Sequence, residues 1–295
     1  TLSLHDALPI SVLVGFGLRQ VPGDQCLWHG VFDGKSVYIL LQVDDFLVCS
    51  PEEWYNKFVA YLWSKGFEVK DLGLASRFIN VQITQNPELG MVTLSQEHYA
   101  KEIVKSCKLE KCSDKATPLN IPQLSPDMLK KCTKEEHSEY RRVLGEVMYL
   151  QTMTRPDLAQ ACSFLSQFLE APLKWHYVEL RRMIRYIRAT VDRCLVYGGQ
   201  YENPKGIAHG KMICYVDSSW DANRSVSGFI VYRCGGPIHW SSRKQKMTTA
   251  STAEAEIVAA SDATKAVLAL RLILRDLGLE ETDSTVLFED NQAAI

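Results

Sequence analysis

The stretch Val37-Tyr-Ile-Leu-Leu-Gln-Val-Asp-Asp-Phe-Leu-Val-Cys49 determines how the first part of this chain is expected to fold. Two short apolar runs, residues 37–43 and 46–49, are rich in residues that favour β-strands, and Asp44-Asp45 separates them. Apolar runs of this kind joined by a short polar turn indicate a β-hairpin. We therefore expect an antiparallel hairpin with two adjacent carboxylates at its tip.

The Asp44-Asp45 pair has two interpretations. Adjacent carboxylates repel each other, and Asn-Gly would serve a turn equally well. A divalent cation would neutralise the pair, and in two-metal phosphoryl transfer carboxylates hold two ions about 3.5–4 Å apart. From this pair alone, a metal site and a solvated hairpin tip are both open.

The hairpin belongs to a first block that covers about residues 11–118. Turn and breaker residues place its remaining elements as a helix near 52–65, strands at 77–84 and 91–94, and a helix that opens at Ser95. Pro118, Pro122 and Pro126 then indicate a linker over residues 119–134. Apolar periodicity predicts helices from about 135 to 200. The linker and helices form a second block, residues 119–205.

The third helix of the second block, expected over residues 175–188, is the most basic part of the chain. Arg181, Arg185 and Arg188 fall on one face of it, at spacings of four and three residues. Taken alone, this pattern is typical of a solvated helix face. In a nucleic-acid enzyme the same face would contact phosphates.

The third block, residues 206–295, has the order strand, strand, strand, long helix, strand. The expected bounds are strands at 212–216, 228–232 and 238–240, a helix at 252–277 and a strand at 286–288. Antiparallel strands followed by a helical crossover predict an α/β unit. Asp217 and Asp290 each follow an apolar strand, near strand ends where sheet clefts lie.

Glu256 is the third acidic candidate of this block. Ser251 and Glu254 have the spacing of a capping box, which explains Glu254. Glu256 lies about 200° around the helix from Glu254 and heads an otherwise apolar stripe, so it needs a partner or a metal. Two alternatives remain open: Glu256 exposed in the first turn near the positive end of the helix dipole, and Glu289 in place of Asp290.

Composition excludes several classes of protein. The chain has 295 residues, 46% of them hydrophobic, so wholesale disorder is excluded. Its 33 basic and 35 acidic side chains exclude a uniformly basic nucleic-acid coat. Nine scattered cysteines with no Cys-x-x-Cys favour a reducing compartment over a disulfide scaffold or a zinc ribbon. No apolar run is long enough to span a membrane, so we expect a soluble intracellular protein.

Both ends of the sequence look cut. Residues 1–10, TLSLHDALPI, match what a common short-read sequencing adapter encodes, and we interpret them as an artefact and leave them out of the fold. The sequence stops at residues 290–295, where a helix would begin after a strand. We therefore expect an internal fragment of a longer protein.

Taken together, these motifs resemble the reverse transcriptase to ribonuclease H region of copia-type retrotransposon Pol polyproteins. The resemblance spans nearly all of residues 15–295, with the motifs in family order. The motifs of the first two blocks are the hairpin, Lys70-Asp-Leu-Gly73, Leu94-Ser-Gln96 with Tyr99, Thr117-Pro118, Tyr140-Arg141, Tyr149-Leu150, Thr154-Arg-Pro-Asp157, Leu165-Ser166, His176 and Arg185-Tyr186. Those of the third block are Asp217, Trp220, Ser227-Gly-Phe229, Trp240-Ser-Ser-Arg-Lys-Gln245, Glu254-Ala-Glu256 and Asp290-Asn291.

The resemblance implies specific site residues. Asp44 and Asp45 match the polymerase metal-binding pair. Asp217, Glu256 and Asp290 match three of the four ribonuclease H carboxylates. Lys70 falls near a palm lysine of the family, and the residues implied to track the template–primer are Arg181, Arg185 and Arg188.

The resemblance also implies the reaction and its setting. The substrate would be an RNA–DNA hybrid or a template–primer, and the metal Mg²⁺, or Mn²⁺. Integrase and protease parts would lie upstream in the parent polyprotein, with no membrane involved. The location would be a cytoplasmic virus-like particle with access to the nucleus.

Three residues depart from the family pattern. Gln42 replaces a tyrosine, Ser219 replaces a second acidic residue, and Asn80 replaces a glycine. The fingers, one palm carboxylate and the fourth ribonuclease H carboxylate would lie outside this chain. We therefore expect the fragment alone neither to polymerise nor to cleave efficiently, because each metal cluster is incomplete.

The fold class expected is mixed α/β (α+β). It would consist of a partial reverse transcriptase palm (11–118), a linker and helical thumb and connection (119–205), and a truncated ribonuclease H-like domain with a mixed sheet (206–295). The leading functional hypothesis is a reverse transcriptase and ribonuclease H fragment. The alternatives are a decayed or repurposed module that binds nucleic acid or another partner without catalysis, and a generic α/β protein.

Overall fold

The computed structural model describes residues 2–4, 10–120, 124–199, 207, 210–221 and 223–295. The chain divides into two compact units, Thr1–Ile79 with Thr264–Ser284 and Asn80–Ala263 with Thr285–Ile295. Helix α7 (Thr252–Asp276) begins in the second unit and ends in the first. Within the described ranges, no helix combines the length and apolar character needed to cross a bilayer.

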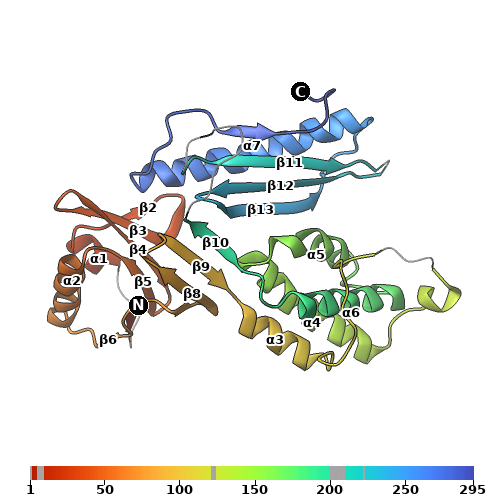
Figure 1. Cartoon of the computed structure of the whole chain (residues 1–295), viewed down its shortest axis with the longest axis horizontal. Coiled ribbons are helices and arrows are strands. Elements are labelled where there is room, and N and C mark those ends of the chain that lie inside the picture. Colours follow the sequence, from red (N-terminus) through yellow and green to blue (C-terminus); the bar gives the residue numbers. More distant parts are fainter. Residues whose placement is uncertain (1, 5–9, 121–123, 200–206, 208–209, 222) are drawn as a thin grey trace. The chain divides into compact units, whose positions relative to one another are not determined.

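The first unit contains a six-stranded sheet in the order β2-β3-β4-β5-β1-β6 (Figure 1). Trp28, Ile39, Phe46 and Phe58 are fully buried in its core. The elements are β1 (Leu2–Leu4), α1 (Ile10–Gly15), β2 (Arg19–Val21), β3 (Asp24–Phe32), β4 (Lys35–Gln42), β5 (Asp45–Cys49), α2 (Glu52–Ser64), β6 (Val69–Asp71) and β7 (Arg77–Phe78).

The predicted hairpin is confirmed as β4 and β5, which pair antiparallel with Gln42 opposite Asp45. Val43 and Asp44 form the two-residue turn, so the turn lies one residue earlier than expected. The strands β2 and β3 were not predicted. In β3 the alternation of apolar and polar residues is broken by Gly30 and by the buried His29, and so the usual strand signal is weak.

Residues 2–4 take part in this sheet although residues 1–10 were left out of the fold. Strand β1 lies between β5 and β6, with Leu2 opposite both Phe46 and Asp71. Leu2 is fully buried. The origin of residues 1–10 stays a prediction, but Leu2–Leu4 fills a place in the sheet and supplies hydrogen bonds to both neighbours.

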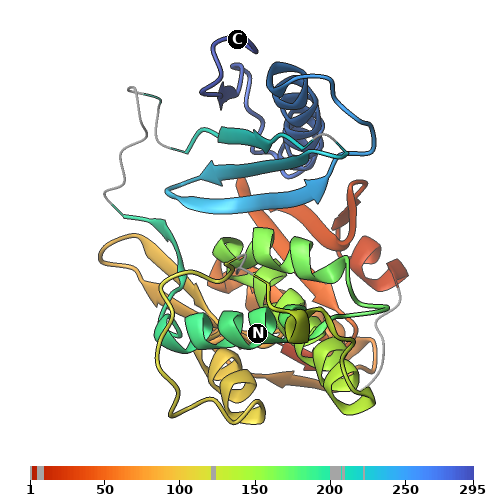
Figure 2. The ribbon, with the colours of Figure 1, turned by 90° about the vertical axis from the view of Figure 1, so that its right-hand side faces the viewer.

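The second unit begins with a small sheet and a helical bundle. Strand β9 pairs with both β8 and β10, and α3, α4, α5 and α6 enclose an apolar core around Tyr140, Leu144 and Ile184 (Figures 1 and 2). The elements are β8 (Val81–Asn86), β9 (Met91–Ser95), α3 (Glu97–Ser106), η1 (Pro126–Leu129), α4 (Lys134–Met153), η2 (Pro156–Leu158), α5 (Ala159–Ser166), α6 (Lys174–Ala189) and β10 (Leu195–Gly198).

Two sequence predictions need correction here. The strand expected over 77–84 is interrupted, because Ile79 and Asn80 have φ angles of 40° and 59°. Left-handed backbone suits glycine best and asparagine next, which explains why Asn80 can occupy a position where glycine is usual in the family. Residues 195–198, expected within the helical block, form β10, because their pairing with β9 outweighs the helical pattern upstream.

The last part of the second unit is a four-stranded sheet in the order β13-β12-β11-β14. Its strands are β11 (Ile213–Ser219), β12 (Val226–Arg233), β13 (Gly236–Lys244) and β14 (Val286–Phe288). Strand β14 runs parallel to β11, whereas β12 runs antiparallel to both β11 and β13. The expected mixed α/β class is thus confirmed.

Candidate acidic and basic sites

The tip of the β4–β5 hairpin presents Asp44 and Asp45 at the surface of the first unit. Asp44 is half-buried and Asp45 is exposed, opposite Gln42. Val43, which precedes them, is 70% exposed and has a φ of 55°. A β-branched residue in left-handed backbone is strained, and such strain clusters at functional sites. Lys70 lies on β6 with an exposed side chain.

Glu256 is buried at the start of α7, as its place on the apolar stripe predicted. It is 6% exposed, and within the described structure its Oε2 atom has no hydrogen-bond partner. Burial raises the pKa of the Glu256 carboxyl, the Ser218 hydroxyl lowers it, and the charges of Glu289, Asp217 and Asp290 raise it further. Three other carboxylates therefore lie within electrostatic range of Glu256.

Asp217 lies inside β11, opposite Gly228, and not beyond the end of the strand as expected. It is exposed and lines a cavity of about 380 Å³ together with Asp157, Ser219 and Trp240. The strand is longer than predicted because Ser218 and Ser219 continue the pairing with β12.

Two neighbouring acidic residues, Glu289 and Asp290, follow β14, and either could be the third acidic candidate of this sheet. Asp290 is exposed, whereas Glu289 is half-buried and accepts hydrogen bonds from the backbone N–H groups of Asp290 and Asn291 at 3.1 and 3.0 Å. The second carboxylate oxygen of Glu289 is buried, and among the described residues it has no partner. Of the two acids, Glu289 has the stronger effect on the pKa of Glu256.

The acidic side chains around Glu256 are close enough to affect its charge, but they do not form an assembled metal site. In the part of the chain that the structure describes, no three His, Cys, Asp or Glu side chains are arranged to hold a metal ion. Asp217, Glu256 and Asp290 come from three separate segments and lie in the same unit. Their assignment as metal ligands stays a prediction.

The arginines of α6 contact a neighbouring segment of the chain. Arg185 donates to the carbonyl of Ser113 at 2.7 Å and also to its hydroxyl. Arg188 donates to the carbonyl of Glu110 at 2.9 Å and to the carboxylate of Asp114 at 2.5 Å. We call residues 110–120 the α6 strap, because they lie along this helix face.

Two further residues of α6 hold the α6 strap. Arg182 donates to the hydroxyl of Thr117 at 3.0 Å, and the buried Glu179 accepts from the backbone N–H of Asn120 at 2.8 Å. Arg181 instead lies 3.6 Å from Glu139. The guanidinium groups predicted to contact nucleic acid are thus engaged within the chain, and their role in binding stays a prediction.

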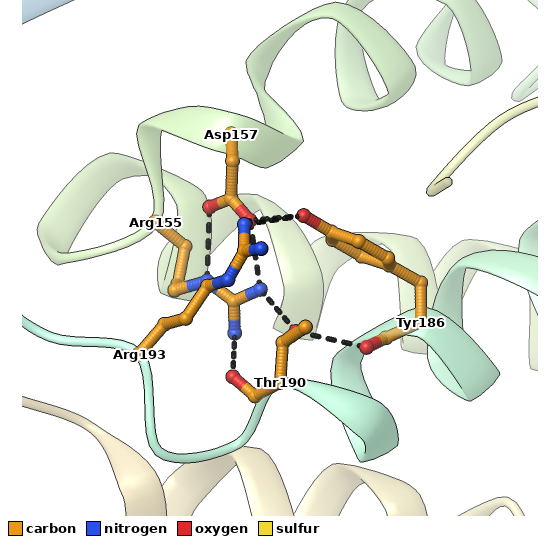
Figure 3. Close-up of polar contacts among 5 residues, drawn as sticks. All are labelled: Arg155, Asp157, Tyr186, Thr190 and Arg193. Carbon is orange, nitrogen blue, oxygen red and sulfur yellow. Dashed lines mark hydrogen bonds and ion pairs between the residues drawn. The ribbon is translucent and has the colours of Figure 1, made fainter. Parts of the chain in front are cut away.

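A buried polar cluster that the sequence analysis did not single out joins η2 to the end of α6 (Figure 3). Arg155 is 2% exposed and donates two hydrogen bonds of 2.9 Å to Asp157. Asp157 also accepts from Tyr186 at 2.7 Å and Arg193 at 3.2 Å, and Arg155 donates to Thr190. Burial raises the pKa of Asp157, but Arg155 and these other donors outweigh it and lower the pKa overall. The Thr154-Arg-Pro-Asp157 motif could have indicated this cluster.

Comparison with known proteins identifies the family. Residues 10–121 match the family described as reverse transcriptase (RNA-dependent DNA polymerase). The chain is 31% identical over 278 residues to the retrovirus-related Pol polyprotein from transposon TNT 1-94 of Nicotiana tabacum, covering 92% of this chain and 21% of that protein. It is 30% identical over 268 residues to the Pol polyprotein from transposon RE2 of Arabidopsis thaliana, covering 88% and 18%.

A solved foamy viral protease–reverse transcriptase in complex with dsDNA aligns with a TM-score of 0.48 at 14% identity, covering 86% of this chain and 55% of that one. The chain spans about a fifth of the length of the curated relatives it matches. From the matching family and these relatives, the chain belongs to the reverse-transcriptase-containing Pol polyproteins of copia-type transposons.

Proposed function

We propose that this chain is the part of a transposon Pol polyprotein that binds RNA–DNA hybrids and carries carboxylates for both RNA-directed DNA synthesis and ribonuclease H cleavage. Asp44 and Asp45 would serve synthesis, and Asp217, Glu256 and Asp290 would serve cleavage. Integrase and protease parts of the same polyprotein would be its partners, and it would act in a cytoplasmic particle with access to the nucleus.

The observation that carries the nuclease part is the state of Glu256. A carboxylate with a buried oxygen that lacks a partner, surrounded by further negative charge, is costly to keep ionised. Such a site becomes favourable when a cation lies against the oxygen. The donor set, made only of carboxylates, is the kind that Mg²⁺ or Mn²⁺ prefers.

The chemistry of this donor set fits a divalent cation, although the described side chains are not arranged around one point. In this proposal Glu256 would hold the cation with Asp217 and Asp290 or Glu289. When bound, the cation would supply charge stabilisation for phosphodiester hydrolysis. In this proposal the chain's own carboxylates bind the cation and orient the substrate. The turn at Val43 places Asp44 and Asp45 at the hairpin tip.

The test uses the chain completed from its genomic locus. Glu256→Ala is expected to abolish Mg²⁺-dependent cleavage of the RNA strand in a hybrid, while hybrid binding persists. Asp290→Ala and Glu289→Ala, assayed in parallel, show which acid beyond β14 is needed. Unchanged cleavage in Glu256→Ala would remove the nuclease assignment and favour a binding module.

The isolated chain is expected to bind hybrids without cleaving or extending them efficiently. The second candidate is a module that binds nucleic acid without catalysis. Efficient Mg²⁺-dependent cleavage by the isolated chain would contradict both the inactivity and the second candidate.

A further inference from the structure

Gln245 connects the last sheet to the first turn of α7. It follows β13 and is 2% exposed. Its side-chain Nε2 donates to the hydroxyl of Ser227 on β12 at 3.0 Å and to the carbonyl of Ala255 in α7 at 2.8 Å. One buried amide thus bonds to both a strand that precedes it and a helix that follows it.

The backbone that carries this side chain is also held in place. The backbone N–H of Gln245 donates to the carbonyl of Ser225 at 2.8 Å. Ser225 is fully buried, and its hydroxyl lies 2.9 Å from that of Thr249. A buried side chain on a bonded backbone has few alternative positions, so the amide of Gln245 is held where Ala255 meets it.

Ala255 directly precedes Glu256, which is 6% exposed and has a buried Oε2 atom without a hydrogen-bond partner among the described residues. The position of the first turn of α7 therefore sets where this buried carboxyl lies. The Ser251 hydroxyl and the Glu254 carboxylate stabilise the helix end locally, by accepting from the backbone N–H groups of Glu254 and Ala250. The bond from Gln245 to Ala255, in contrast, holds this turn to the sheet.

We propose that Gln245 is a positioning residue, which holds the first turn of α7 and therefore Glu256 against β11 and β12. This inference rests on the proposed nuclease function for its purpose. The geometry of the amide bonds can nonetheless be tested in the chain by itself, without any cleavage assay.

The test is Gln245→Met, which keeps the length of the side chain and removes its donors. In hydrogen exchange, the amides of residues 255–260 are expected to exchange at least tenfold faster, while those of 213–216 and 228–231 change less than twofold. The side-chain carboxyl ¹³C resonance of Glu256, assigned with Glu256→Gln, is expected to shift. If Gln245 only stabilised the domain as a whole, the amides of the sheet and of the helix would all exchange faster by the same factor.

The matched control is Ser225→Ala, which removes the buried hydroxyl contact to Thr249 and leaves the Gln245 side chain intact. It is expected to leave the Glu256 resonance and the exchange of 255–260 unchanged. If Gln245→Met does not fold, Ser227→Ala removes one acceptor of the same amide and is expected to loosen the same turn less strongly.

Unchanged exchange at 255–260 in the folded variant, or a uniform increase across the domain, overturns the positioning role. Localised loosening supports it, even where the completed chain cleaves no hybrid. In that case only the proposed nuclease function fails.

Discussion

Glu254 and Glu256 lie two positions apart at the start of α7 and have opposite environments. The carboxylate of Glu254 accepts from the backbone N–H of Ala250 at 2.6 Å, while the Ser251 hydroxyl accepts from that of Glu254 at 3.2 Å. Glu256 is buried beside Glu289, Asp217 and Asp290, and its pKa is raised. One glutamate therefore stabilises the folded chain, and the other destabilises it when ionised.

Replacing Glu256 by Gln is expected to raise the free energy of unfolding at pH 7, measured by urea denaturation in EDTA. Because the carboxyl pKa is raised in the folded state, the wild-type chain loses stability as pH rises through that pKa. The advantage of Glu256→Gln therefore vanishes below the ordinary pKa of a glutamate in an unfolded chain.

The control for this pair of residues is Glu254→Ala, which is expected to lower the free energy of unfolding by about 0.5–1.5 kcal/mol through loss of the hydrogen bond from Ala250. Mg²⁺ is expected to reduce the difference in the free energy of unfolding between Glu256→Gln and wild type, since the cation favours the ionised carboxylate. If the Glu256→Gln chain were less stable than wild type at pH 7, other groups in the folded chain would already stabilise the ionised carboxylate of Glu256.

Asp157 is a residue whose loss is expected to unfold the helical region. Asp157→Asn leaves the guanidinium of Arg155, 2% exposed, without its charged partner. Breaking a buried pair from one side costs about 3–5 kcal/mol. Thermal denaturation checks this, with Asp127→Asn as a control, because the ion pair of Asp127 with Lys130 is exposed. A similar small effect for both variants would contradict the buried-pair argument.

At the scale of elements, α6 is a two-sided helix. One side packs Leu180, Met183 and Ile187 into the core, and another carries Glu179, Arg182, Arg185 and Arg188, which hold the α6 strap. These four residues recur every three positions, so their row winds around the helix by about 60° per step, and the α6 strap follows it. In this structure the basic character of α6 organises the chain itself.

The double variant Arg185→Gln, Arg188→Gln is expected to release the α6 strap. The strap contains Lys111 and Lys115, so a lysine-specific protease should cut the variant there several-fold faster than wild type. Arg181→Gln is the matched control, since Arg181 lies 3.6 Å from Glu139 and not at the strap. Equal cutting of the two variants would mean that the arginines do not hold the strap.

At the scale of the whole molecule, a net charge of -2 requires any affinity for nucleic acid to come from local cations. Lys70 is exposed on β6, whereas the guanidinium of Arg185 is occupied by Ser113. These two residues therefore separate an exposed cation from one that is bound within the chain.

Affinity for an RNA–DNA hybrid, measured by fluorescence anisotropy over a salt series, is expected to fall steeply with salt. Lys70→Gln is expected to reduce the slope of log K against log[salt] by about 1. Arg185→Gln is expected to leave the slope unchanged. Equal reductions would show that the α6 strap leaves its helix when nucleic acid binds, and affinity independent of salt would contradict hybrid binding.

Local sequence patterns predicted those parts of this chain that depend on near neighbours. The β4–β5 hairpin, the Ser251 cap of α7 and the burial of Glu256 follow from strand alternation, side-chain capping and helical periodicity. The predicted capping box is only half formed, because Glu254 accepts from the N–H of Ala250 and not from that of Ser251. Strand β10 did not follow from any such pattern, because its partner β9 lies about a hundred residues upstream and no local signal records that pairing.

The sequence by itself determined the mixed α/β class, the family and which acidic side chains are candidates, because these rest on composition, motifs and short-range geometry. Only the tertiary structure decided that the arginines of α6 hold the α6 strap, that Glu289 acts on Glu256 more strongly than Asp290 does, and that Gln245 bonds to Ala255. Each of these depends on tertiary packing between elements, which no local sequence pattern records, and the free energy of that packing is shared over the whole chain.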